Sequence, residues 1–161
     1  MRTNRIVSFV SAAACLLSVS ACKSTEGVVN PYVAIAGSYT LLTANGELPL
    51  RFFHTDGTGQ LLTVDLVSGT LSLTATGTFH EGLQYHVTPP APAAPYDAAL
   101  ATTDGTYTVN GSTITFTYIP GNGPNAGQPY SWSGTLGTGS VTYTDPIFTD
   151  ITGGLTAVYT K

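Results

Sequence analysis

The sequence predicts an all-β domain and, within that class, an antiparallel up-and-down barrel of roughly 8–10 strands. Short runs of alternating apolar and polar residues follow one another, separated by Gly, Pro and Asn. The chain contains 27 Thr, and only 9% of its residues are charged, against about 25% in typical soluble domains. Threonine is β-branched and favours strands. No amphipathic helical repeat follows residue 30, so we expect little helix in the domain.

The clearest strand pair is a predicted hairpin in residues 104–118. Asn110-Gly111 stands between two alternating runs, and this pair tolerates the positive φ angles of a type I′ turn. A two-residue loop there predicts two facing pairs, Val109 with Ser112 and Tyr107 with Ile114. One face then carries the apolar side chains of Tyr107, Val109, Ile114, Phe116 and Tyr118. The opposite face carries threonines, so a slip of one residue would bury polar groups.

The other alternating runs predict strands at residues 34–44, 50–54, 60–67, 70–74, 78–87, 130–133, 141–143 and 155–161. Residues 75–77 form a three-residue loop with Gly in the left-handed position, which brings Leu73 opposite Phe79. Two segments rich in proline, 88–103 and 120–129, break the alternation, and we expect long loops there.

The order of these runs indicates the architecture. Nearly all predicted strands are joined by short sequential connections, which place each strand beside the next in an antiparallel arrangement. Closing such a sheet into a barrel removes its exposed edges. A two-sheet β-sandwich is the alternative.

Residues 1–21 have the form of a lipoprotein signal peptide. Arg2 and Arg5 precede an apolar stretch, and Val19-Ser20-Ala21-Cys22 follows it. These four residues resemble the lipobox of bacterial lipoproteins, which implies that Cys22 is acylated and becomes the new N-terminus. An ordinary secretion signal cut before Cys22 is the alternative. A transmembrane anchor would need about 20 apolar residues, more than this stretch offers.

The leader determines what we expect of the mature chain. Cys15 leaves with the leader, so Cys22 is the one remaining Cys, and acylation removes what would otherwise be a reactive thiol. We expect residues 22–32 to form a lipidated N-terminus and tether, and residues 33–161 to form the barrel domain. The membrane is then a partner through the N-terminal lipid. Lys23 stands where an Asp would imply the inner membrane, so the resemblance implies the outer membrane if the cell is Gram-negative.

The charge balance argues against nucleic acid as a partner. Without Arg2 and Arg5, three basic residues face nine acidic ones, a net charge of −6. Binding to a phosphate backbone requires a basic surface, which this composition does not supply.

Four segments of the domain resemble small lipocalin-like lipoproteins of bacteria: residues 37–41, 45–49, 105–116 and 158–161. The resemblance implies a lipocalin-like barrel in the bacterial cell envelope and a small hydrophobic ligand. Lipocalins carry a Trp in a Gly-x-Trp motif on the first strand, with a basic residue of the last strand packed over it. Tyr39 takes the place of that Trp here, and Lys161 is the candidate basic partner.

The histidines do not indicate a metal site. His80 and His86 share a strand and a face but lie six residues apart, which is about 20 Å. His54 and Asp56 lie at a strand end without a third ligand. We expect surface histidines. The sequence also lacks the motifs of nucleophilic, zinc and phosphate chemistry, so we expect neither enzyme activity nor a cofactor.

Glu81 is in phase with the apolar residues of its predicted strand. Inside a barrel it would hold a polar group of a ligand, with Arg51 as a partner. Alternatively, Gly82 marks a β-bulge that turns Glu81 outward. We favour an outward Glu81, because buried carboxylates are rare unless they are paired.

The aromatic residues of the predicted strands lead to two hypotheses about function. They would line a ligand cavity, for which the candidate residues are Tyr107, Phe116, Trp132, Tyr85 and Glu81. Alternatively, they would fill the core. The first hypothesis is a cell-envelope lipoprotein that binds a small apolar ligand. The second is a structural or interaction protein of the envelope with a filled barrel.

Overall fold

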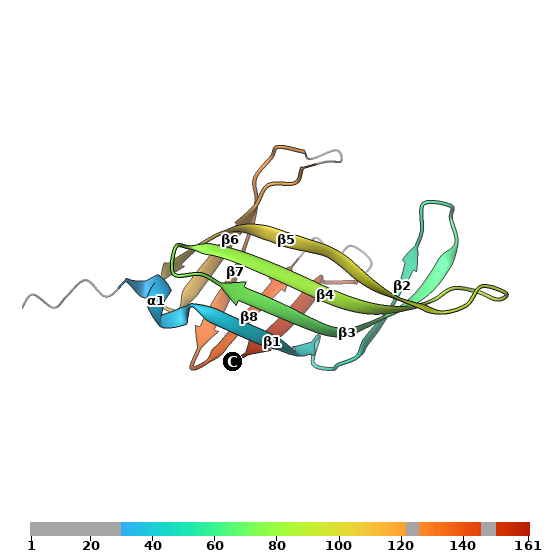
Figure 1. Ribbon diagram of the computed structural model, residues 1–161, viewed down its shortest axis with the longest axis horizontal. Coiled ribbons are helices and arrows are strands. Elements are labelled where there is room, and N and C mark those ends of the chain that lie inside the picture. The colour runs from blue at the N-terminus through green and yellow to red at the C-terminus, as the bar shows by residue number, and fades with distance from the viewer. Residues whose placement is uncertain (1–29, 122–125, 146–150) are drawn as a thin grey trace, which may run out of the picture.

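The alternating runs of the sequence form a closed antiparallel β-barrel with a short helix at one end (Figure 1). The structure, a computed structural model, describes residues 30–121, 126–145 and 151–161. The predicted signal peptide, Cys22 and most of the predicted tether lie outside these residues.

The described residues contain one helix and nine strands. They are α1 (Pro31–Ile35), β1 (Gly37–Ala44), β2 (Leu50–Thr55), β3 (Leu61–Leu73), β4 (Thr78–Thr88), β5 (Tyr96–Asn110), β6 (Thr113–Tyr118), β7 (Tyr130–Gly137), β8 (Ser140–Asp145) and β9 (Leu155–Thr160). In this part of the chain no helix has the length and apolar character needed to cross a membrane.

Eight of the strands form the closed ring, in the order β1-β9-β8-β7-β6-β5-β4-β3. The ring closes where β1 pairs with the second half of β3, from Gly37 opposite Leu73 to Thr40 opposite Thr70. The up-and-down barrel predicted from the sequence is therefore confirmed, and the two-sheet sandwich is wrong.

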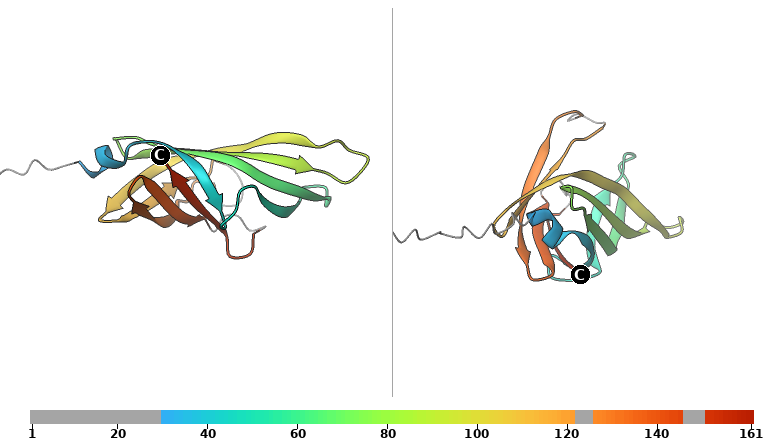
Figure 2. Two further views of the ribbon diagram at one scale, coloured as in Figure 1. Left: turned by 90° about the horizontal axis from the view of Figure 1, so that it is seen from below. Right: turned by 60° about the vertical axis from the view of Figure 1, so that its left-hand side comes forward.

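Strand β2 lies outside the ring and continues the line of β1. It pairs with the first half of β3, from Leu50 opposite Leu66 to Thr55 opposite Leu61. Strands β3, β4 and β5 therefore run beyond the shorter strands β6 to β9 (Figure 2). Strand β2 with residues 61–66, 83–88 and 96–100 forms what we call the sheet extension.

A β-bulge lies in each of β3 and β5 where the ring meets the sheet extension. In β3 the register against β4 shifts between Leu66 and Ser68. In β5 the shift lies opposite Gly82, where two residues of β5 face one residue of β4. An extra residue reverses which side chains of a strand point inward. Residues 60–67 and 70–74, predicted as two strands, are therefore one strand, β3, whose alternation changes phase at the bulge.

The connection between β4 and β5 is shorter than predicted. It covers residues 89–95 rather than 88–103, and all four prolines fall within it. Proline prevents strand pairing only at the position it occupies, because it lacks the N–H. The chain therefore returns to the sheet directly after Pro95, with Tyr96 opposite Val87.

The first predicted strand begins later than residue 34, because a helix precedes it. Pro31 occupies the first turn of α1, and the Asn30 side chain accepts a hydrogen bond of 3.0 Å from the Tyr32 N–H. Both features favour a helix start. The predicted tether of residues 22–32 thus ends inside α1, and β1 begins at Gly37.

The hairpin of β5 and β6 has the predicted faces but a different turn. Asn110 pairs with Thr113, so the two loop residues are Gly111 and Ser112. Gly111 has a φ of +60°, which suits the first central position of a type II′ turn. The register differs from the prediction by two residues, so every side chain keeps its predicted face.

The two ends of the barrel have different connections. The tight turns at residues 74–77, 111–112 and 138–139 lie at the end that carries α1, which we call the α1 end. The last residues of β2, β4, β6 and β8 and the first residues of β3, β5, β7 and β9 lie at the opposite end, which we call the long-loop end.

Candidate functional site

The five residues predicted to line a ligand cavity all point into the barrel and are buried. Tyr85, Tyr107, Phe116 and Trp132 belong to one hydrophobic core, but they pack at different places along it. Tyr107 packs against Tyr32 of α1 with ring centroids 5.3 Å apart. Tyr85 packs against Phe52 of the sheet extension, with centroids 6.1 Å apart. The candidates therefore extend from one end of the barrel to the other.

Aromatic rings pack together in the part of the barrel near α1. Phe116 on β6 lies at the centre of this aromatic core, with ring centroids 5.0 Å from Phe79, 5.5 Å from Trp132, 5.1 Å from Tyr143 and 6.5 Å from Tyr107. Edge-to-face and offset pairs at such distances are favourable packing contacts. Three predicted lining residues, Tyr107, Phe116 and Trp132, thus pack against other side chains of the protein.

Inward-facing glycines leave room for these rings. A Cβ atom at Gly134 would lie 2.7 Å from Tyr143 Cβ. A Cβ atom at Gly69 would lie 2.7 Å from Leu83 Cδ2 and 3.2 Å from the Tyr159 hydroxyl. Small barrels commonly combine small and large inward residues in this way. The glycines therefore allow two tyrosines to reach the centre of the barrel.

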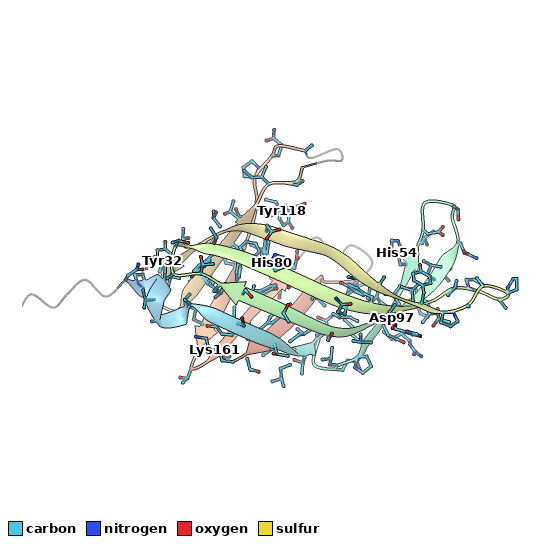
Figure 3. The ribbon with its side chains drawn as sticks, in the orientation of Figure 1. Tyr32, His54, His80, Asp97, Tyr118 and Lys161 are labelled. Carbon is cyan, nitrogen blue, oxygen red and sulfur yellow. The ribbon has the colours of Figure 1, made fainter. Side chains whose placement is uncertain are left out.

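Helix α1 covers the end of the aromatic core (Figure 3). The Tyr39 hydroxyl donates a hydrogen bond of 2.6 Å to the Ile35 carbonyl. Lys161 Nζ donates to the Ala36 carbonyl at 2.9 Å and lies 4.9 Å from the centre of the Tyr39 ring. The contact between Tyr39 and Lys161 that the resemblance implied is therefore present.

Glu81 on β4 is buried at the centre of the barrel, with 5% of its surface exposed. Tyr143 on β8 donates a hydrogen bond to Glu81 Oε1. Tyr159 on β9 donates a second one to the same oxygen, at 2.5 Å. Since β4 lies across the ring from β8 and β9, these two hydrogen bonds cross the barrel interior.

The outward orientation that we favoured for Glu81 is wrong. A bulge does lie beside Gly82, but the extra residue belongs to β5. Strand β4 alternates without a break, so Glu81 keeps the inward face of Phe79 and Leu83. The predicted partner is also wrong, since Arg51 lies on the outer surface.

Burial controls the protonation of this centre. It raises the pKa of Glu81, and the charge of Asp145 raises it further, while the two tyrosine hydrogen bonds act in the opposite direction. Burial, followed by the charge of Glu81, raises the pKa of Tyr143 and of Tyr159. Both tyrosines therefore keep their protons and act as hydrogen-bond donors to Glu81.

Polar groups continue from Glu81 toward the long-loop end. Asp145, the last residue of β8, is 6% exposed. The Tyr85 hydroxyl is buried and has no hydrogen-bond partner among the described residues, and the same holds for Trp132 Nε1. After burial itself, the charges of Glu81 and Asp145 raise the pKa of Tyr85, so its hydroxyl lies in the field of both acids. We call Glu81, Tyr85 and Asp145 the polar centre.

Sequence reasoning missed three members of this environment: Tyr143, Asp145 and Tyr159. The alternation of β8 and β9 does place all three on the inward face. What alternation cannot tell is which inward residues of distant strands meet. That depends on how the ring closes.

The inward surface of the sheet extension leads from the polar centre to the long-loop end. Phe52 lies opposite Val64, and His54 lies opposite Leu62, so both point inward from β2. Tyr96 shares the inward face of Val87 at the far edge and is 51% exposed. These three side chains form the accessible rim of the interior.

The outer face of the sheet extension carries a row of charged groups. Arg51, Asp65, His86 and Asp97 are successive cross-strand partners on β2, β3, β4 and β5. Arg51 forms two hydrogen bonds with Asp65, at 2.7 and 2.9 Å, and His86 Nδ1 lies 2.7 Å from Asp97. The surface position predicted for His80 and His86 is confirmed, whereas His54 is partly buried.

No protein-family model matches this chain, and no curated protein or solved structure is similar enough to count as a match. The barrel interior itself therefore carries the information about function.

Proposed function

We propose that this protein is a cell-envelope lipoprotein whose barrel binds a small apolar ligand at its long-loop end. The observation that carries the proposal is the Tyr85 hydroxyl, which is buried without a partner among the described residues. Leaving such a group unsatisfied costs about 1–3 kcal/mol. A ligand whose polar group reaches Tyr85 would recover this cost.

The proposed site differs from the one expected from the sequence. Tyr107, Phe116 and Trp132 belong to the aromatic core and the α1 end, so we place the ligand on the other side of Glu81. Its apolar body would lie against Phe52 and the ring of Tyr85. It would enter past the rim, where Tyr96 is exposed.

The membrane anchor is the second part of the proposal. It rests on the leader of residues 1–21 and on Cys22 in the lipobox-like tetrapeptide. A lipid at the N-terminus would hold the barrel at the membrane surface. Ligands that partition into lipid would then be concentrated near it.

One observation favours the alternative function, a structural or interaction protein of the envelope. The aromatic core fills the part of the interior near α1 with contacts between side chains of the protein, and the buried side chains toward the other end belong to the same hydrophobic core cluster. If this packing leaves no cavity, the barrel has no room for a ligand. A binding experiment separates the two functions.

Trp132, the single Trp of the chain, reports on the interior by its fluorescence. We would titrate the protein with a hydrophobic dye and with lipids extracted from envelopes, and follow Trp132 emission and the melting temperature. Binding should shift both. Phe52→Ala should weaken binding by roughly tenfold, as loss of a central aromatic contact commonly does.

Phe53→Ala is the matched control, because Phe53 is the next residue of β2 and points outward with 59% exposed. It should leave binding unchanged. If no apolar ligand changes the emission or the melting temperature, the result favours the structural or interaction protein over the ligand-binding protein. Equal effects of the two variants would place any ligand elsewhere.

A further inference from the structure

The polar centre contains two buried acids. Glu81 and Asp145 lie in an interior otherwise lined by aromatic and aliphatic side chains. An ionised carboxylate in such a place is costly unless a cation or several hydrogen bonds compensate its charge. A positive charge would therefore stabilise this interior. It would come either from a side chain of the barrel or from a ligand.

The described part of the chain does not supply that charge to Glu81. The partners of Glu81 there are the Tyr143 and Tyr159 hydroxyls, both on one oxygen. The basic side chains that the structure describes have other positions: Arg51, His80 and His86 pair with aspartates on the outer face, Lys161 lies over Tyr39, and His54 lies at the rim opposite Leu62.

Tyr85 provides an independent observation. It is 1% exposed, lies on the same inward face of β4 as Glu81, and its hydroxyl has no partner among the described residues. Glu81 lies four residues away on the same face of β4, and Asp145 follows Tyr143, which donates to Glu81, by two residues on the inward face of β8. A phenol oxygen accepts hydrogen bonds as well as donating one. It is therefore the third acceptor near the two carboxylates.

We propose that Glu81, Asp145 and Tyr85 bind the protonated amine of a small ligand with an apolar body. This inference rests on the proposed function and names its ligand class. An ammonium group has three donors and no acceptor, which matches carboxylate and phenol oxygens. A ligand carboxylate would be repelled whenever either acid is ionised. A metal ion is a poorer match, because the described residues contain no group of three or more His, Cys, Asp or Glu able to hold one.

Binding of the amine should release a proton. Burial raises the pKa of Glu81, so at any pH below that raised value the barrel without ligand holds this group as a carboxylic acid. When the ammonium arrives, Glu81 loses its proton to solvent and becomes the paired carboxylate. The titratable groups that face Glu81 are Tyr85 on β4, Tyr143 and Asp145 on β8, and Tyr159 on β9. Its neighbours on β3 and β5, Leu71 and Thr103, do not titrate.

The test compares three probes of similar shape: phenethylamine, 2-phenylethanol and 3-phenylpropionate. Isothermal titration calorimetry of the full chain near pH 7 gives each affinity, and repetition in buffers of different ionisation enthalpy gives the proton release. The amine should bind at least about tenfold more tightly than the alcohol, since charge-assisted hydrogen bonds are roughly twice as strong as neutral ones. The carboxylate should bind most weakly.

Variants assign the preference to the polar centre. Glu81→Gln should bind the amine no more tightly than the alcohol and should release no proton. Tyr85→Phe, which removes a single hydroxyl, should lower amine affinity several-fold and serves if Glu81→Gln does not fold. Glu47→Gln is the matched control, because Glu47 is exposed on the connection between β1 and β2. It should behave as the wild type.

The outcomes separate this inference from the proposed function. The wild type could bind the hydrophobic dye and yet bind the amine and the alcohol with equal affinity, or bind neither. Either result overturns the amine site and leaves the proposal of apolar binding intact. A preference for amine that persists in both Glu81→Gln and Tyr85→Phe also overturns the site. If neither the dye nor any of the three probes binds, the proposed function fails, and this inference fails with it.

Discussion

Replacing Glu81 with Gln should remove a pH dependence from the stability of the barrel. Glutamine keeps the shape of the side chain and the oxygen that accepts from Tyr143 and Tyr159. It cannot ionise. The variant therefore changes the titration of the centre and little else.

The sign of the effect follows from the direction of the pKa shift. The pKa of Glu81 is raised from its ordinary value of 4.5, so above that pH the unfolded chain has lost a proton that the folded chain keeps. The free energy of unfolding of the wild type then falls as pH rises. For one proton the slope is at most about 1.4 kcal/mol per pH unit. It begins near pH 4.5 and ends at the raised pKa of the folded state.

Urea denaturation followed by Trp132 fluorescence, from about pH 4 to about pH 8, measures this slope. Other acids titrate in both proteins, so the quantity to plot is the unfolding free energy of the wild type minus that of Glu81→Gln. This difference should fall with rising pH. Glu47→Gln makes the same substitution at an exposed acid and is measured beside it as the control. A flat difference for Glu81→Gln would refute the raised pKa and the buried, cation-free environment assigned to Glu81.

Two further predictions concern the hairpin and the N-terminus. Gly111→Val should destabilise the domain by at least about 1 kcal/mol, because a β-branched residue is strained at the positive φ of Gly111; Thr113→Val on the outward face should be nearly neutral, and a reversed order in thermal unfolding would contradict the turn. Metabolic labelling with a fatty acid should mark the wild type but not Cys22→Ala, and equal labelling of both, or of neither, would argue against the lipid anchor.

The inward and outward faces of most strands could be predicted because strand alternation is a local property. The hairpin faces of β5 and β6 were correct, and so was the pairing of Leu73 with Phe79. The turn at Asn110-Gly111 was displaced because Gly111 alone takes a positive φ there. Either turn leaves the same residues inside, so the sequence pattern does not distinguish them.

The errors arose where one strand depends on its neighbours. Ser68-Gly69 resembles a turn. In the structure it follows a bulge, and β3 continues through it because both sides of the bulge pair with β4. The sequence marks Gly82 as a bulge position, yet the extra residue lies in the partner strand, β5. A bulge is a mismatch between two strands, so the sequence of one of them cannot say which strand carries it.

By itself the sequence determined that this chain is built of alternating strands with aromatic residues on their inward faces, since local periodicity and turn residues encode both. Only the tertiary structure decided that Glu81 lies at the centre of that barrel beneath two tyrosines. Those tyrosines are 62 and 78 residues away along the chain. They meet Glu81 because ring closure sets β8 and β9 opposite β4, and because Gly69 and Gly134 leave room for their rings. Contacts of that kind depend on the geometry of the whole ring, and no local pattern records them.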